Sequence, residues 1–392
     1  MSLLRKTRII IFVVFATALS GISARSQETQ YPKPTDLPNP YRLVEGWPTL
    51  PKNLNGGHWG EVIRVHAEPN GNVWVFHRCF SVVPPGHATC VQRGEDNPPI
   101  LEFNPAGNLI KSFGSGIFAY PHGFTVDARG NLWATDVNDE PQILGLSAKN
   151  AGGVVMGQEV LELSPNGKVL MTIGKEGVAG NGPDAFDRPT GVAIAPNGDI
   201  FVSDGHYPNK FHTARVVKFS KDGKFIKSWG ELGSGDGQLD GPHDICIGGS
   251  QNRVYVADRR NRRIEVFDQD GKFIASWKQF GQPSSVFVGK DDTIYVGASF
   301  SDAKDQIESR ARARASENVA DYIEVTKHEI RGIVIGSAKD GSLKAFIPDP
   351  ADLTKMTDVG SSASGIAADD TGTTIYAADV AVHNLRKYVK VQ

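Results

Sequence analysis

A short motif recurs along this chain and constrains its fold more than any other feature. It is clearest over 120–136, where alternating apolar and small residues lead through a Gly-Asn turn into an apolar run that ends in Asp. Similar stretches follow at 188–204 and 241–258. The pattern is typical of two short strands joined by a tight turn. Repetition at this spacing predicts one supersecondary unit that is stacked many times.

Counting these units predicts a closed ring. Five units have four predicted strands each, whereas the sixth, which starts at Ala363, has three. The stretch 41–47 resembles the last strands of the later units and can supply the missing strand, which would remove an exposed sheet edge. The expected fold is therefore all-β, a six-bladed β-propeller over 41–392. The complete units span 62–114, 121–174, 189–230, 242–277 and 283–347.

The N-terminus predicts export. Basic residues precede an apolar run over 9–18, and small residues follow. This order is typical of a secretory signal peptide, which we place at 1–26, with a linker over 27–40. An uncleaved membrane anchor is the alternative, although the apolar run is short for a span. We expect a secreted or periplasmic protein that has no membrane attachment after signal cleavage.

The cysteines are consistent with an oxidising compartment. Cys79 and Cys90 flank a predicted loop and could pair there. Cys246 lies in a predicted inner strand and is expected to be a buried small residue. The odd number of cysteines means that a disulfide framework cannot be inferred.

Charge and loop lengths limit the possible partners. The net charge of −2 and the lack of a basic stripe argue against nucleic acid. Three long connections, 81–99, 138–158 and 301–332, follow second strands, and loops of this length are often functional. The arginines of 310–314 are interpreted as part of a surface helix, with anion binding as the alternative. We expect a monomer.

The start of each first strand points to a metal site. The residue after the leading position should lie at the channel mouth, because innermost strands line the channel of a propeller. Two of these residues are histidines in alternate units, and imidazole suits zinc or another borderline metal. A purely structural Pro-His turn is the alternative. In chain order the position holds Ile63, His122, Thr190, His243, Ser284 and Ser364.

The ends of the second strands should lie at the same face, because neighbouring strands are antiparallel. Arg78 and Arg259 are there and could hold a carboxylate, although a salt bridge within its own repeat is the alternative for Arg259. Tyr207 or His206 could act as a general base beside a metal. The acidic residue that ends the second strand is interpreted as binding local backbone amides. It recurs as Asp136, Asp204, Asp258 and Asp379.

Taken together, these residues resemble the peptidyl-α-hydroxyglycine α-amidating lyase family, with blades that resemble NHL repeats. The likeness extends from about Gly60 to Phe280, in order and with similar spacing, and continues more weakly to the C-terminus. It rests on Phe76-His-Arg78, Tyr120-Pro-His-Gly123, Pro189-Thr190, Val202-Ser-Asp-Gly205, Gly241-Pro-His243 and Val256-Ala-Asp-Arg259.

The resemblance implies a secreted six-bladed propeller with a zinc ion held by three histidines. It also implies a reaction that splits a carbinolamide into a peptide amide and glyoxylate, with a tyrosine base and two arginines. By position, His122 and His243 would be two of the zinc ligands, and Arg78 and Arg259 the two arginines. The tyrosine position falls on His206, with Tyr207 next to it.

The sequence departs from that pattern in the last unit. The position of the third zinc ligand holds Ser364, and a hydroxyl is a poor zinc ligand. The Asp that binds a structural calcium in the family has become Gly365, which argues against calcium here. A water, or a residue from a long loop such as His212 or His328, would have to complete the zinc shell.

Three functions follow, in this order. The first is a metal-dependent, lyase-like enzyme with an incomplete metal triad, acting on peptidyl-α-hydroxyglycine or a related carbinolamide or hydroxy acid. Its substrate would be a peptide or small molecule that carries a carboxylate. The second is a non-catalytic propeller that binds a peptide or sugar partner at the same face. The third is a calcium-dependent lactonase, which would need a cluster of Glu, Asp and Asn where this ring has histidines and hydroxyls.

Overall fold

The computed structural model describes residues 31–79, 98–137, 156–206, 211–300, 329–351 and 362–391. The chain separates into a unit over Met1–Tyr31 and a unit over Pro32–Gln392, and every element given below belongs to the second. The predicted signal peptide, most of the three long connections, and the arginines of 310–314 lie outside the described residues. No helix among those residues is long and apolar enough to cross a membrane.

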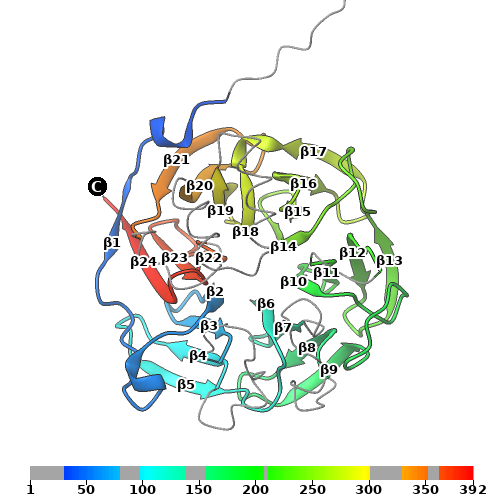
Figure 1. The fold of residues 1–392 in the computed structure, drawn as a ribbon, viewed down its shortest axis with the longest axis horizontal. Coiled ribbons are helices and arrows are strands. Elements are labelled where there is room, and N and C mark those ends of the chain that lie inside the picture. Colours follow the sequence, from blue (N-terminus) through cyan, green and yellow to red (C-terminus); the bar gives the residue numbers. More distant parts are fainter. Residues whose placement is uncertain are drawn as a thin grey trace, which may run out of the picture. The chain divides into compact units, whose positions relative to one another are not determined.

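The second unit contains six antiparallel sheets of four strands each, arranged in a ring with the first strand of each sheet nearest the centre (Figure 1). The all-β propeller prediction is confirmed. Blade one consists of β2 (Val62–Ala67), β3 (Val73–His77), β4 (Ile100–Phe103) and β5 (Leu109–Phe113). Blade two consists of β6 (Pro121–Val126), β7 (Leu132–Asp136), β8 (Glu159–Leu163) and β9 (Val169–Gly174). Blade three consists of β10 (Pro189–Ile194), β11 (Ile200–Asp204), β12 (Arg215–Phe219) and β13 (Phe225–Trp229).

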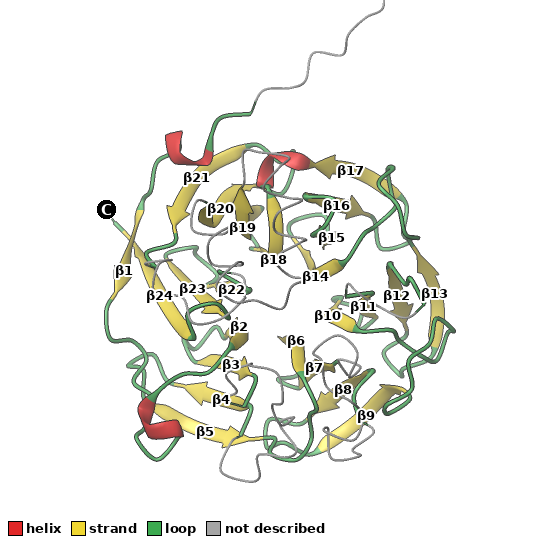
Figure 2. Cartoon of the chain, viewed as in Figure 1, coloured by secondary structure: helices red, strands yellow, loops and turns green. Residues whose placement is uncertain are grey.

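The remaining blades follow the same plan from the channel outward. Blade four consists of β14 (Pro242–Gly248), β15 (Arg253–Asp258), β16 (Arg263–Phe267) and β17 (Phe273–Trp277). Blade five consists of β18 (Gln282–Val288), β19 (Thr293–Phe300), β20 (Ile330–Ser337) and β21 (Leu343–Pro348). Blade six consists of β22 (Gly365–Ala368), β23 (Thr374–Asp379), β24 (Asn384–Lys390) and β1 (Tyr41–Val44). Figure 2 shows the only helices in the described part, the short 3₁₀ turns η1 (Pro34–Asp36), η2 (Asn55–Gly57) and η4 (Lys278–Phe280).

The N-terminal strand closes the ring, as its sequence predicts. β1 pairs antiparallel with β24, with Tyr41 opposite Lys390 and Val44 opposite Lys387. The segment before β1 also contacts the ring, since the amide of Phe346 donates to the carbonyl of Pro38 at 3.0 Å. Closure gives blade six its fourth strand and covers the edge of β24 that would otherwise be exposed.

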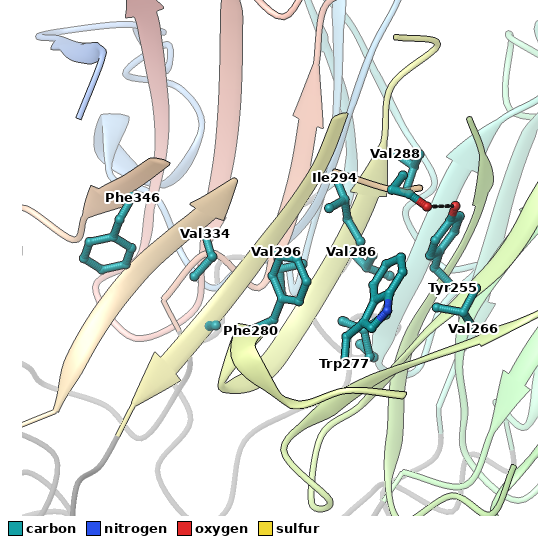
Figure 3. Packing of buried hydrophobic residues seen from close by; sticks show 14 residues of the cluster. Tyr255, Val266, Trp277, Phe280, Val286, Val288, Ile294, Val296, Val334 and Phe346 are labelled. Atoms are coloured by element: carbon teal, nitrogen blue, oxygen red, sulfur yellow. Dashed lines mark hydrogen bonds between the residues drawn. The ribbon is translucent and has the colours of Figure 1, made fainter. Parts of the chain in front are cut away.

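Apolar side chains fill the spaces between successive blades. The second and third strands are almost wholly buried, because both of their faces pack against neighbouring blades. Figure 3 shows one such cluster between blades four and five, where Trp277, Phe280 and Val296 pack together. The buried hydroxyl of Tyr255 in this cluster donates to the carbonyl of Ala338 at 2.9 Å, which satisfies its polar end.

The predictions for the cysteines are confirmed in part. Cys79 is disulfide-bonded, and Cys90 lies outside the described residues. Cys246 is free and half-buried rather than fully buried. Its side chain still packs against the apolar cluster between blades four and five, so its role as a small packing residue agrees with the prediction.

A buried carboxylate at the end of the second strand ties each of four blades together, as expected. These carboxylates accept hydrogen bonds from the amides of residues that lead into the first strand, from Tyr120 to Asp136 at 2.6 Å and from Asp187 to Asp204 at 2.8 Å. Equivalent bonds run from Asp240 to Asp258 and from Ala363 to Asp379.

Blade two lacks the arginine that pairs with this carboxylate elsewhere. In blades three, four and six the partners are Arg215–Asp204, Arg263–Asp258 and Arg386–Asp379. In blade two the residue opposite Asp136 is Glu159. Burial raises the pKa of Asp136 to about 8, and that of Glu159 to about 7, with Glu176 adding to both shifts.

Because of Asp136 and Glu159 in blade two, we expect the free energy of unfolding to fall as pH rises. The folded state binds protons more strongly than the unfolded state between about pH 4 and pH 8, because both folded pKa values are raised. We expect Glu159→Gln to raise Tm by about 2–4 °C at pH 8 and to change it little at pH 5. Thermal unfolding at the two pH values is the measurement.

The matched control is Arg215→Gln in blade three. It leaves the carboxylate of Asp204 buried without its charged partner and should destabilise the protein by about 3–5 kcal/mol. A Glu159→Gln variant that melts below the wild type at pH 8 would contradict the account of blade two.

Candidate metal centre

Two histidines enter the channel mouth from equivalent positions. His122 and His243 are the second residues of β6 and β14. In both blades the pairing with the second strand shifts directly after the leading proline, which leaves the histidine in a bulge. Bulges re-aim the side chains they contain. The two rings consequently meet, with their centroids 4.9 Å apart.

A third histidine reaches the same point from the end of the second strand of blade three. Gly205 follows β11 with a φ of 125°, which residues with side chains rarely adopt. A Cβ there would lie 2.0 Å from the carbonyl oxygen of Thr213, so the turn requires glycine. The turn places the ring of His206 with its centroid 5.1 Å from that of His122 and 5.2 Å from that of His243.

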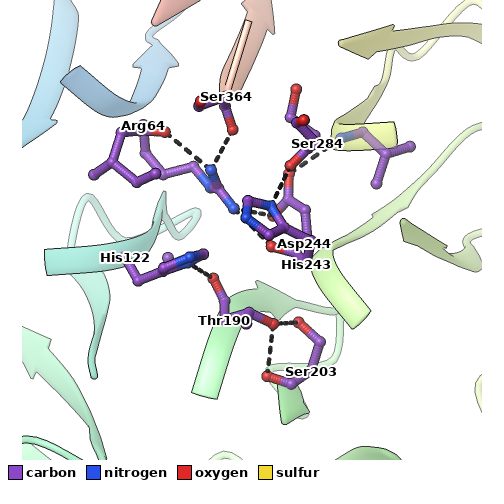
Figure 4. Close-up of polar contacts among 12 residues, drawn as sticks. Arg64, His122, Thr190, Ser203, His243, Asp244, Ser284 and Ser364 are labelled. Carbon is purple, nitrogen blue, oxygen red and sulfur yellow. Dashed lines mark hydrogen bonds and ion pairs between the residues drawn. The ribbon is translucent and has the colours of Figure 1, made fainter. Parts of the chain in front are cut away.

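The three imidazoles could hold one metal ion. Among the described residues, one ring nitrogen from each of His122, His206 and His243 lies within 4.8 Å of the other two. Figure 4 shows how two of the rings are oriented: Nδ1 of His122 is 2.7 Å from the carbonyl of Thr190, and Nδ1 of His243 is 2.7 Å from that of Ser284. When Nδ1 donates to a carbonyl, Nε2 is left as the atom that can bind a metal.

The state of these rings fits a metal ligand set. Nε2 of His122 is buried and has no hydrogen-bond partner. Burial, reinforced by nearby positive charge, lowers the pKa of His122 well below its ordinary value. Burial and the charge of Arg259 do the same for His243. Both rings are therefore neutral at pH 7, as a metal ligand must be, and a set of three histidines is typical of zinc sites that keep an open position.

Arg78 lies beside the triad in a fixed position. It follows β3 directly and is 8% exposed. Its Nη1 is 2.5 Å from Oε2 of buried Glu61, and its Nε donates to the carbonyl of Pro121 at 3.3 Å. Its Cζ lies 4.0 Å from the centroid of the Tyr120 ring. These contacts hold the guanidinium at the entry to β6, on the two residues that directly precede His122.

Arg259 takes the equivalent position in blade four. It follows β15 directly and is half-buried. After burial, its positive charge is the largest influence on the pKa of His243, so the guanidinium lies near that ring. The neighbouring arginines of the same turn bind elsewhere, with Arg260 on Asp240 and Arg263 on Asp258. The channel mouth thus combines three imidazoles with two cationic side chains.

Comparisons with known proteins relate the chain to NHL-repeat proteins and to peptide-amidating enzymes. The NHL repeat model matches residues 186–219 and 239–267, in blades three and four. The peptidyl-glycine α-amidating monooxygenase of Mus musculus is 33% identical over 223 residues, covering 53% of this chain and 20% of that protein. Peptidyl-α-hydroxyglycine α-amidating lyase 1 of Drosophila melanogaster is 28% identical over 276 residues, covering 63% of this chain and 46% of that protein.

The protein is a six-bladed propeller with NHL repeats in blades three and four, and it resembles the peptidyl-α-hydroxyglycine α-amidating lyases. The chain matches only about a fifth to a half of the length of these relatives. A solved gluconolactonase from Xanthomonas campestris covers 90% of the chain, with 96% of its own length, at a TM-score of 0.51 and 13% identity. That likeness shows the fold alone.

The sequence offered His206 as a candidate general base, whereas the structure places its ring beside those of His122 and His243, where it can be a metal ligand. Ser364 is fully buried, and its carbonyl accepts a hydrogen bond from Arg64. His212 is exposed and does not belong to the triad. Tyr207 and His328 lie outside the described residues. Blade three, between the two predicted ligands, therefore supplies the third imidazole in place of blade six.

Sequence reasoning missed four residues of this NHL propeller that surround the triad. Glu61 binds Arg78, Tyr120 lies against the same guanidinium, and Arg64 pairs with Asp244. A signal for the last pair was present, because each directly follows a residue of the predicted channel ring. The sequence alone does not reveal the pairing of Arg64 with Asp244, since a charge in an inner strand has no obvious partner until the ring is closed.

Zinc titration of the metal-free NHL propeller tests the triad. We expect one zinc per chain, and we expect His206→Ala and His122→Ala each to weaken binding by at least about a hundredfold, because even loss of a residue that only supports a ligand costs about 10–100-fold. His212→Ala is the matched control and should bind zinc as the wild type does. Unchanged zinc affinity in His206→Ala would exclude this residue from the site.

Proposed function

We propose that this NHL propeller is a metal-dependent lyase that cleaves a peptidyl-α-hydroxyglycine or a closely related carbinolamide. The observation that carries the proposal is the set of three histidine ring nitrogens within 4.8 Å of one another, with Arg78 and Arg259 beside them. The names of the relatives support the same reaction class. On the basis of the predicted signal peptide, we also propose that the protein is exported.

His122, His206 and His243 would hold the metal, with zinc as the ion best suited to imidazole. A zinc ion bound there would act as a Lewis acid on the hydroxyl oxygen of the substrate. The protein itself keeps His122 and His243 neutral through burial and orients them through the carbonyls of Thr190 and Ser284.

The two arginines would bind the substrate carboxylate and the oxygen that gains charge. A guanidinium can bind a carboxylate through two parallel hydrogen bonds. Glu61 fixes Arg78 by an ion pair, and Pro121 accepts a further hydrogen bond from it, so its direction is set before the substrate arrives. Such preorganised charge is worth most in a site that excludes water.

The proton of the substrate hydroxyl needs an acceptor. As it leaves, the oxygen forms the carbonyl of glyoxylate, the bond between the α-carbon and the amide nitrogen breaks, and that nitrogen takes up a proton. With His206 assigned to the metal, we propose Tyr207 as the acceptor. Tyr120, whose ring lies 4.0 Å from Cζ of Arg78, is the second candidate.

Glyoxylate release from an α-hydroxyglycine peptide tests the function. Zinc-loaded wild type should release glyoxylate and the peptide amide in equal amounts, and metal-free protein should release neither. Arg78→Ala and Arg259→Ala should each lower kcat/KM by about 10²–10³-fold, because each removes a charged group aimed at the reacting atoms.

Exposed Arg260, next to Arg259 but paired with Asp240, gives the matched control Arg260→Ala, which should keep wild-type kcat/KM. Tyr207→Phe compared with Tyr120→Phe decides between the two proton acceptors. A zinc-loaded protein that releases no glyoxylate would overturn the proposal and favour the non-catalytic binding propeller.

A further inference from the structure

A buried arginine spans the channel directly next to the triad. Arg64 lies on β2, and its side chain is 4% exposed. It directly follows Ile63, the channel-ring residue of blade one, just as Asp244 follows His243 in blade four. Blades one and four face each other across the channel, since the inner strands contact in the cyclic order β2, β6, β10, β14, β18, β22. The ion pair between them, 3.4 Å from Nη2 of Arg64 to Oδ1 of Asp244, therefore crosses its diameter.

The guanidinium gathers backbone oxygens from three blades. Figure 4 shows Arg64 between Ser364 and His243. Its Nη1 donates to the carbonyl of Ile63 at 2.9 Å and to that of Ser364, and its Nη2 donates to the carbonyl of His243 at 2.9 Å. Blades one, six and four are thereby joined by one side chain.

Three carbonyl oxygens and one carboxylate are a ligand set that normally surrounds a hard divalent cation such as calcium. Here the cation at the centre is a guanidinium, which stays protonated in proteins. The carboxylate of Asp244 is fixed in position by the amide of Val286, which donates to its Oδ2 at 3.1 Å. A buried charge of this kind persists only when it is paired and hydrogen-bonded.

The calcium site that the family resemblance implies does not fit this channel. Gly365 has no carboxylate to offer. A Cβ at that position would lie 2.7 Å from the Cα of Arg64 and 2.8 Å from the carbonyl oxygen of Ile63, closer than real Cβ contacts come. An acidic side chain at 365 would therefore require β2 to move.

We propose that the Arg64 guanidinium replaces a structural divalent cation in this channel. The side chain binds the oxygens that such a cation would bind, and it joins blade one to blades four and six without any metal. The NHL propeller is accordingly independent of calcium for its stability. Removal of the guanidinium exposes the same oxygens and creates a calcium requirement.

Thermal unfolding of the full chain with saturating zinc, in a calcium-selective chelator or in about 1–10 mM calcium, tests this. Wild type should melt at the same temperature in both. Arg64→Ala should melt lower than wild type in chelator by roughly 5 °C or more, because a buried ion pair has lost one partner. Calcium should restore at least about half of that loss by binding the folded state.

Two further variants separate a cation site from a general weakening. Arg64→Ala combined with Asp244→Asn removes the carboxylate and should show no calcium response. Arg64→Lys keeps a positive charge in place and should stay insensitive to calcium. If Arg64→Ala does not fold in chelator, recovery of folded protein on refolding in calcium supports the proposal. If this variant folds in neither condition, the proposal is overturned.

The proposal also fails if Arg64→Ala melts like the wild type, or if calcium stabilises it no more than it stabilises the wild type. A calcium response in Arg64→Lys overturns it as well. None of these measurements uses lyase activity, so they decide the role of Arg64 whatever substrate the channel mouth accepts.

Discussion

The pairing of β1 with β24 is the interaction on which the rest of the molecule depends. The channel mouth exists only when the inner strands are held in a closed circle, and the last blade has three strands of its own. The side chains that define the mouth come from blades one, two, three and four, and the carbonyl of Ser364 joins them from blade six. A strand near the start of the chain therefore governs the geometry of side chains as distant in sequence as His243 and Arg259.

Within the closed ring, local backbone features aim each functional group. A bulge after the leading proline turns His122 and His243 toward the channel, and a left-handed glycine turns the chain into His206. The carboxylate at the end of the second strand holds the entry to the first strand in four of the blades. The chemistry is thus placed by strand ends, whereas the strand centres supply the packing.

Much of this could be predicted, because aligning the repeats shows which residues of different blades occupy equivalent positions. Once the units were aligned, the fold, the closing strand and the equivalent positions of His122 and His243 followed from counting. The third imidazole did not, because the family resemblance directed attention to Ser364 and assigned His206 to proton transfer. Only the conformation of Gly205, which sequence leaves open, shows where His206 points.

Arg64 escaped sequence reasoning for a different reason. Its partners are the carbonyls of Ser364 and His243, and backbone oxygens leave no trace in a residue pattern. Asp244 was visible, but an ion pair between blades that are far apart in the chain becomes evident only when the ring is assembled. Residues that act across the channel are harder to predict than residues that repeat around it.

The bonds that orient the imidazoles have a consequence for how the ring comes apart. His122 of blade two is held by Thr190 of blade three, and His243 of blade four by Ser284 of blade five. An ion bound to the triad would therefore fasten four consecutive blades into one cooperative block. Loosening of the molecule would then leave that block intact longest, and blades six and one, which Arg64 joins to it, would separate from it first.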